Sequence, residues 1–597
     1  NQANNNTANN QANNNTANNQ ANNNTASNQA KPALKTGVSD NQGNKVADTS
    51  SQNKMGENNT EVNRINAMSK QDTLALAKSS DMTKIASTEV AAMAKNMGTT
   101  EFKEMGGAKV ADMAKNMGAN DFKEMGGSKV ADMAKNMGGD DFKNMGGSKV
   151  ADMAKNMGSN DFQKMGGSKI TEMAINMGSD DFKNMGGSKI ADMAKNMSND
   201  DFKKMGGSKI TDMAKNMGGD DFKNMGSSKV ADMAKNMMAE NFTDMDGSKI
   251  ANMAKNIEGD EFKSMGGEKI AAMAKNMESE NFKDMGGGKI AAMVKTLSSS
   301  RFQELGGSKI ADMAKNMDSD NFKEMGNQKI VDMTRNMESD NLQQMGGEKL
   351  AAMAKNMAFD GFKDIGGEKV AAMAKNMESG NFKSMGGSSI SEMMKSMSTE
   401  TFTDVGGSKL ADMAKNMESG NFKSMGGQKI AELTKHMNSD NFQDMGGSKL
   451  ADMTKNIGSE NFKNMGGEKI AELAKNMAGD NFKDMGGQTI ADMAKNMRGM
   501  DFKALGGSKV ADMAKNMDSE NFKDMGDMQI AIMTRSMRGE NFKEMGGDKL
   551  VAMAQNMREA AFKEMGGEKI AAMAKNMESG NFKSCLLYTS PSPRDRG

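Results

Sequence analysis

The chain is nearly free of the side chains that carry most hydrolytic and redox chemistry. Its 597 residues include no tryptophan and only one tyrosine, one cysteine and one histidine. A Ser–His–Asp triad or a zinc site needs several such groups held together. The single histidine, His436, has no such set of partners and falls on the predicted exposed side of a helix. We therefore predict that the protein is not an enzyme, and we assign no catalytic, cofactor-binding or metal-binding residue and no cofactor.

An excess of charge of one sign and a long apolar run are also absent. Lysine plus arginine and aspartate plus glutamate both number 79, so the formal net charge is zero. Proteins that bind nucleic acids usually carry a basic excess that neutralises phosphates. No apolar run approaches the roughly 18 residues that cross a bilayer. We predict no membrane span, and nothing in the sequence indicates a compartment.

Methionine, glycine and phenylalanine are abundant because one motif is repeated. The chain holds 72 methionines, 66 glycines and 25 phenylalanines. From residue 86 a 20-residue unit recurs without a change of register. Unit starts run from 86 to 566 in steps of 20, which gives 25 copies, the last cut short. Residues 126–145, GGSKVADMAKNMGGDDFKNM, serve as the type unit.

The first half of the unit has the pattern of an amphipathic helix. Ser128 follows two glycines and is suited to be the N-cap, because its hydroxyl oxygen can accept a backbone N–H of the first turn. Apolar residues then recur at i, i+3, i+4 and i+7 and form one stripe: Val130, Met133, Ala134 and Met137. The polar residues between them are expected to face outward: Lys129, Asp132, Lys135 and Asn136.

The second half of the unit predicts a shorter helix. A break at Gly138-Gly139 is followed by Asp140 and Asp141, which suit the positive end of a helix dipole. In several copies a serine precedes the acids, as at Ser179. Phe142 and Met145 are three apart and share a face. Gly146-Gly147 end this helix, since glycine readily takes the left-handed C′ conformation.

One unit alone cannot fold. Its large apolar side chains contribute roughly 1.5–3 kcal/mol each when buried, whereas ordering 20 residues costs about 30 kcal/mol. Folding becomes favourable only if neighbouring units cover both flanks of each apolar face. We predict an all-α fold, a right-handed or otherwise superhelical α-solenoid of about 25 two-helix repeats, with one layer of the stack per repeat. A β-solenoid would need a short strand in each unit, and the type unit has none.

The flanks of the array differ in composition. Residues 1–65 are rich in Asn, Gln and Thr and predict a disordered low-complexity segment and linker. Residues 66–85 predict a degenerate capping repeat, and 86–584 form the tandem array. Residues 585–597, CLLYTSPSPRDRG, break the motif in mid-unit and resemble the in-frame translation of a transposase-type sequencing adapter. We predict that this tail is not native.

Two features could suggest a bound metal, and each has a structural explanation. Methionine is a ligand of copper(I), but Met133 and Met137 lie on the apolar stripe, and Leu433 and Ile457 occupy equivalent positions. This substitution favours packing. The acidic loop around Asp140 faintly resembles calcium-binding repeats, yet its sequence varies and lacks the six or more fixed oxygens that such a site needs.

Residues 129–145, KVADMAKNMGGDDFKNM, locally resemble the repeats of transcription activator-like effectors. The resemblance implies a helix, a loop and a second helix, with a base-reading residue after the loop asparagine. That position here is Met137, and its column is methionine almost throughout, with Ile257, Leu297 and Ile457 among the exceptions. Such a column cannot hold a base code. The family's repeats are also longer than these units.

The leading functional hypothesis is a non-enzymatic structural or interaction scaffold that binds an unknown protein or repetitive surface, or acts as a spacer. The alternative hypothesis is a nucleic-acid-binding helical repeat protein. The two differ in where the lysines should lie. If Lys129, Lys135, Lys143 and their equivalents line one groove with the acids elsewhere, the alternative gains support.

Overall fold

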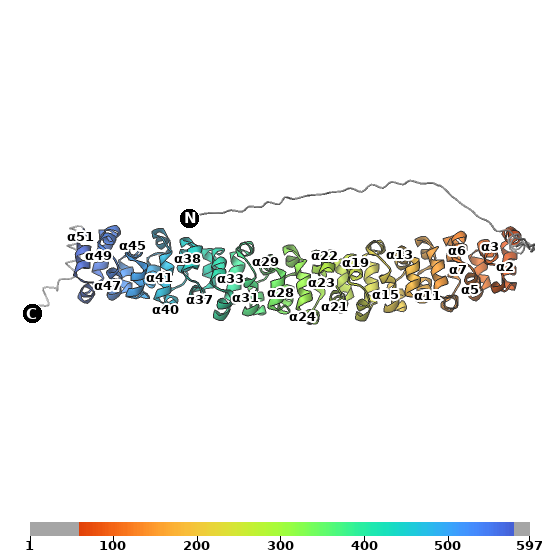
Figure 1. The fold of residues 1–597 in the computed structure, drawn as a ribbon, viewed down its shortest axis with the longest axis horizontal. Coiled ribbons are helices and arrows are strands. Elements are labelled where there is room, and N and C mark those ends of the chain that lie inside the picture. The colour runs from red at the N-terminus through yellow and green to blue at the C-terminus, as the bar shows by residue number, and fades with distance from the viewer. Residues whose placement is uncertain (1–58, 578–597) are drawn as a thin grey trace, which may run out of the picture. The chain divides into compact units, whose positions relative to one another are not determined.

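The computed structural model describes residues 59–577, and all regular structure among them is helical. Thr60 onwards forms one compact unit. Its helices follow one another in chain order from α2 (Lys70–Ser79) to α51 (Gly567–Lys575), as Figure 1 shows. The predicted all-α repeat solenoid is confirmed. No helix among the described residues is long and apolar enough to cross a membrane.

The described residues begin inside the segment that was predicted to be a low-complexity region and linker, residues 1–65. Residues 59–67 are helical, and a 3-10 helix, η1 (Met82–Lys84), follows α2. The assignment of 66–85 as a capping repeat stays a prediction. The Asn-rich residues 1–58 and the tail 585–597, with the predictions made for them, lie outside the described residues.

Long and short helices alternate with the period of the repeat. Long helices begin at residue 87 and at every twentieth residue up to 567, as in α7 (Gly127–Lys135). They are nine residues long, except for ten-residue α3, α5 and α23 (Ser87–Asn96, Gly107–Asn116, Gly287–Thr296) and eight-residue α39 (Gly447–Thr454). Short helices begin at residue 99 and at every twentieth residue up to 559 and are seven residues long, as in α8 (Gly139–Met145). The exception is α18 (Ala239–Thr243).

A single glycine joins each short helix to the next long one. Gly126 has φ 85° and ψ 148° and is at once the C-cap of α6 (Ala119–Met125) and the N-cap of α7. These angles differ from the predicted left-handed C′ geometry, because ψ is extended, and this region is essentially restricted to glycine. The prediction that Ser128 is the N-cap is wrong. Ser128 lies inside α7, and the backbone carbonyl of Gly126 accepts the Val130 N–H instead.

One repeat shows what happens without that glycine. Asp246 occupies the same position with φ −69°, and the helix before it, α18, ends at Thr243 instead of continuing to Met245. A residue with a Cβ does not readily adopt the positive φ of the other copies. The chain therefore leaves the helix earlier and spreads the bend over Asp244 to Asp246.

The start of each short helix is capped from within. The Asp141 carboxylate accepts the Gly138 N–H at 2.8 Å, which satisfies a backbone donor that the helix itself leaves unpaired. Later copies use asparagine in the same way, as where Asn281 accepts the Glu278 N–H at 2.8 Å. Ser179 is the first residue of its helix, α12 (Ser179–Met185), and Gly178 is the cap.

The stacking of helices has a period of three helices. Helix α7 contacts α10 (Ser159–Met165), and α10 in turn contacts α13 (Gly187–Lys195). The same relation holds along the array, so the helices form three columns in which long and short helices alternate. With one helix per ten residues, a superhelical turn takes about 30 residues, or one and a half repeats. This differs from the expected stack with one layer per two-helix repeat.

The core runs continuously through the array. Val130, Met133, Met137 and Phe142 are fully buried, and Met145 is buried at the edge. One apolar cluster extends from Ile65 to Met573. Each column contributes side chains to this cluster, so a helix buries its stripe against helices roughly one turn before and after it. The prediction that neighbouring units cover each unit's apolar face is confirmed. The covering helices come from the superhelical turns before and after.

The second glycine of each repeat permits close approach between turns. A Cβ on Gly127 would lie 2.3 Å from Asp161 Oδ2 and 2.7 Å from the carbonyl oxygen of Asn156. The beginning of α7 therefore packs directly against the cap of α10, which Asp161 forms on the next superhelical turn. This contact fixes which helix stacks on which.

Candidate functional site

The lysine at the third position after most linking glycines is part of the fold and not of the surface. Lys169 Nζ donates to the carbonyl oxygen of Met137 at 2.7 Å, and Lys189 Nζ donates to that of Met157 at 2.6 Å. In the type unit Lys129 donates to Met97. These carbonyls lie just beyond the C-terminal ends of long helices, where the helix dipole favours a cation.

The expectation that Lys129, Asp132 and Asn136 face outward is therefore wrong, whereas Lys135 is exposed as expected. All three exceptions are half-buried. Asn136 Nδ2 donates to the carbonyl oxygen of Asp132 at 2.9 Å and so ends the helix. Sequence periodicity shows which side chains lie off the apolar stripe. Lys129, Asp132 and Asn136 lie at the edges of that stripe, where the adjacent superhelical turn covers them.

The exposed lysines lie among acids. Lys295 Nζ lies 2.7 Å from Glu324, and Lys95 Nζ lies 3.4 Å from Glu124, on the short helix one turn later. Others lie close to the acid three residues earlier, as Lys455 does to Asp452 at 2.9 Å. Because the Lys129 column is half-buried and the Lys135 column is interspersed with carboxylates, these two columns do not form a continuous basic groove in the described array.

The methionines of the stripe fill the core. Met133 and Met137 have no exposed surface, and Leu433 and Ile457 are buried in the same way at equivalent positions. The two acids of the acidic loop differ in role. Asp141 caps α8, whereas Asp140 is exposed. Among residues 59–577, no three His, Cys, Asp or Glu side chains are placed to hold a metal ion together.

His436 is the one titratable ring in the described array, and it is not on the exposed side as predicted. It replaces the asparagine at the C-cap of α37 (Gly427–Lys435) and is half-buried. Its Nδ1 lies 3.3 Å from Thr403 Oγ1, and its Nε2 is buried without a hydrogen-bond partner. The ring centroid is 6.2 Å from that of Phe402. Burial lowers the pKa of His436 below its usual 6.5.

Replacing His436 with asparagine, the residue of most other repeats, should remove a weak acid sensitivity. Because the pKa of the folded ring is lowered, protonation below pH 6.5 favours the unfolded chain, and local stability falls as the pH drops from 6.5 towards the folded pKa. Hydrogen exchange of α37 at neutral and mildly acidic pH measures this loss. The same acid-induced loss in His436→Asn would show that neighbouring carboxylates cause it.

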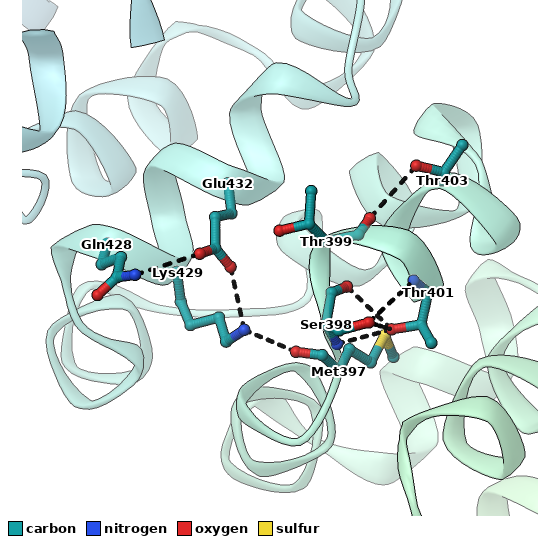
Figure 2. A network of polar contacts seen from close by, with 8 residues as sticks. All are labelled: Met397, Ser398, Thr399, Thr401, Thr403, Gln428, Lys429 and Glu432. Carbon is teal, nitrogen blue, oxygen red and sulfur yellow. Dashed lines mark hydrogen bonds and ion pairs between the residues drawn. The ribbon is translucent and has the colours of Figure 1, made fainter. Parts of the chain in front are cut away.

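A polar network next to His436 also serves local structure (Figure 2). Lys429 Nζ donates to the Met397 carbonyl oxygen at 2.6 Å and to Glu432 at 3.0 Å, and it lies 5.5 Å from the Phe402 ring centroid. The Ser398 N–H donates to Thr401 Oγ1 at 2.8 Å, which caps α34 (Thr399–Val405). The Ser398 and Thr401 hydroxyls are therefore used in capping.

No protein-family model matches the chain, and no curated protein matches it. Among solved structures, it is similar to a homology model of the full-length AP-3 complex in an intermediate open conformation, with 9% identity, 92% of this chain and 94% of that chain covered, and a TM-score of 0.21. It is similar to Kap121p bound to Ste12p, with 8% identity, coverage of 76% and 53%, and a TM-score of 0.18.

The cohesin subunit Scc3 from Z. rouxii is similar at 12% identity, with 82% of this chain and 62% of that chain covered and a TM-score of 0.18. The chain thus spans about half of the Kap121p chain and somewhat less than two thirds of the Scc3 chain. TM-scores at this level carry no argument about how the chain works. What stands is the architecture itself, a helical-repeat solenoid with three columns of helices.

Proposed function

We propose that the protein is a non-enzymatic interaction scaffold, a solenoid that presents one surface many times for multivalent protein binding or for spacing. The observation that carries this proposal is the division of polar groups. Those that are half-buried, such as Lys129 and Asp141, serve the fold. Those that remain exposed recur at fixed places in each repeat, as Lys135, Asp140 and Lys143 do in the type unit.

The three columns determine how that surface is repeated. Long helices α7 and α13 lie in the same column with α10 between them. Equivalent side chains therefore return to the same face every third repeat. With helices packed about 8–10 Å apart, the spacing along one face is roughly 16–20 Å. A partner with matching sites could engage several copies at once, and its avidity would exceed its affinity for one copy.

The stoichiometry of a purified partner complex tests this proposal. Native mass spectrometry of the intact chain saturated with a single partner should show several copies of that partner on each chain. A complex that saturates at one copy would contradict multivalent presentation. The readout is the copy number, so non-specific capture of one protein does not count as support.

The alternative proposal, nucleic-acid binding, is less well supported by the placement of charge. Phosphate binding needs cations that are free to replace the counterions of the phosphates, yet Lys129 donates to a backbone carbonyl and Lys295 pairs with Glu324. Titration with single- and double-stranded oligonucleotides at low and physiological salt distinguishes the two proposals. Tight, salt-sensitive binding would favour the nucleic-acid alternative.

A further inference from the structure

One stretch of the array departs from the otherwise repetitive surface. It includes the short helix α44 (Gly499–Leu505) and the long helix α47 (Asp527–Arg535), which stack in one column. Met500 on α44 is 69% exposed, the largest value among the exposed large apolar side chains, and Met528 on α47 is 45% exposed. Exposed apolar residues of this size are rare elsewhere in the described array, so this local change needs its own explanation.

The substitutions here are coordinated when compared with the preceding repeat. The positions of Met500, Ile532 and Arg538 are held there by three aspartates: Asp480, Asp512 and Asp518. Two carboxylates are thus replaced by apolar side chains and the third by a guanidinium. The two apolar residues, Met500 and Ile532, lie close together in space. A Cβ on Gly499, the residue next to Met500, would lie 3.6 Å from Ile532 Cγ2.

Arginine is concentrated in the same stretch. Lysine is the usual cation of the array, and residues 59–577 contain seven arginines. Four of them fall between residues 498 and 558: Arg498, Arg535, Arg538 and Arg558. Arginine presents a planar fork of donors that can bind a carboxylate with two hydrogen bonds, which lysine cannot do. The presence of arginine in this stretch therefore favours recognition of carboxylates over general solvation.

Part of this stretch lines a hollow of about 1030 Å³ between the column of α44 and α47 and the neighbouring column of α45 (Gly507–Lys515) and α48 (Gly539–Met545). Its apolar lining includes Met500 and Ile532, and its cationic lining comprises Lys503, Arg535, Arg538 and Lys569, against two acids, Glu540 and Glu564. Met528, Arg498 and Arg558 lie outside this lining. Arg535 is paired with Glu564, and Lys569 donates to the Met537 carbonyl oxygen. Within the described array, Lys503 and Arg538 have no ion-pair partner, and both are exposed.

We propose that this hollow is a docking site for an acidic, leucine-rich segment of another protein. An aliphatic side chain of the segment would lie on Met500 and Ile532, and its carboxylates would pair with Lys503 and Arg538. The lining favours a peptide over a single-stranded nucleic acid, because it includes no aromatic ring on which bases could stack. Among residues 59–577 this combination of Met500, Ile532 and Arg538 occurs once, and the site does not depend on multivalent presentation by the other repeats.

Fluorescence anisotropy of a labelled peptide of alternating glutamate and leucine, titrated with the intact chain, tests this site. The triple variant Met500→Asp, Ile532→Asp, Arg538→Asp restores the residues of the preceding repeat, so it should fold as that repeat does. We expect binding at one site per chain, weakened by about tenfold or more in the triple variant, since both an apolar contact and a charge are lost.

A second variant, in which the same three residues are introduced 20 positions earlier, tests the site even if the triple variant is destabilised. The reverse substitutions Asp480→Met, Asp512→Ile and Asp518→Arg should create a second peptide site, so the stoichiometry should rise from one to two. Unchanged peptide affinity in the triple variant, or equal binding of a lysine–leucine peptide, would overturn the proposal. So would a preference for phosphatidylserine vesicles or for a single-stranded oligonucleotide over the acidic peptide.

Discussion

Replacing Gly127 with asparagine is expected to destabilise the contact between α7 and α10, and a second replacement, Asp161→Gly, is expected to restore most of the loss. In the native chain Asp161 Oδ2 accepts the Gly158 N–H at 2.9 Å and occupies the space where a Gly127 side chain would lie. Asparagine at 127 would crowd that carboxylate, and overpacking of this kind typically destabilises by about 1–3 kcal/mol.

The double variant copies a solution that the chain already uses. At the equivalent contact, Asn327 stands in place of the second glycine and Gly361 in place of the capping acid. Asn327 Oδ1 accepts the Ala358 N–H at 2.9 Å, so the cap comes from the preceding turn. A Cβ on Gly361 would lie 2.5 Å from that oxygen. The two side chains are thus alternatives for one space.

A double-mutant cycle measures this coupling. Asp161→Gly alone should lose a helix cap, about 1 kcal/mol, and the two single changes together should exceed the loss in the double variant by about 1–3 kcal/mol. Because long repeat arrays depart from two-state unfolding, local hydrogen exchange of α7 and α10 is the suitable readout. Strictly additive losses would show that residues 127 and 161 do not share one space.

The helices were predictable from the sequence, but the superhelical turn was missed. The stripe from Val130 to Met137 and the glycine pairs predict a long and a short helix in each unit, and both are present. The assumption of one layer per repeat was wrong because periodicity describes the unit and not the geometry of its links. A one-residue glycine link bends the chain so that the turn closes only after three helices.

The sequence nevertheless contains a signal for that turn. Where one residue departs from the consensus of the repeat, a second residue at a constant distance along the chain departs as well. Asn327 is matched by Gly361, and Asp527 is matched by Ala561, where most other repeats have glycine and an acid or asparagine. Ser227, a third exception, is matched by the longer Glu261, and its hydroxyl accepts the Glu258 N–H at 2.8 Å. Departures from the consensus therefore predict stacking that the consensus itself conceals.

The surface could be predicted only in part, for a related reason. Lys135 is exposed as expected, whereas Lys129 and His436 are half-buried because the adjacent superhelical turn covers them. One repeat considered alone does not contain that turn. The hollow beside Met500 likewise requires residues from two columns, and the sequence alone shows only scattered departures from the consensus at Met500, Ile532 and Arg538.

Deleting one repeat, residues 306–325, is expected to leave a cooperatively folded array, whereas deleting one superhelical turn, residues 306–335, is expected to disrupt it. The shorter deletion keeps the alternation of long and short helices. Gly287, which now packs against Asn321, would meet Asn341 in the same role. Lys349 would likewise replace Lys329 at the Leu297 carbonyl oxygen.

The longer deletion preserves the number of helices per turn but places short helices on short helices and long on long. It also places Asn336 at the link after α24 (Ser299–Leu305), where the shorter deletion places Gly326 in the role of Gly306. In the shifted register Phe359 would stand in place of Lys329 opposite the Leu297 carbonyl oxygen, and Ala351 would stand in place of Asn321 opposite Gly287. A buried carbonyl left without its donor costs about 1–3 kcal/mol, and all three columns are mismatched at the junction.

Thermal unfolding followed by circular dichroism, together with hydrogen exchange on both sides of the junction, separates the two outcomes. The 306–325 deletion should keep the unfolding profile of the intact chain and native protection throughout, while the 306–335 deletion should add a transition at lower temperature and lose protection near the junction. Equal tolerance of both deletions would mean that long and short helices are interchangeable within a column. In that case the lysine-to-carbonyl bonds and the glycine-to-cap contacts would not be what fixes the register of the solenoid.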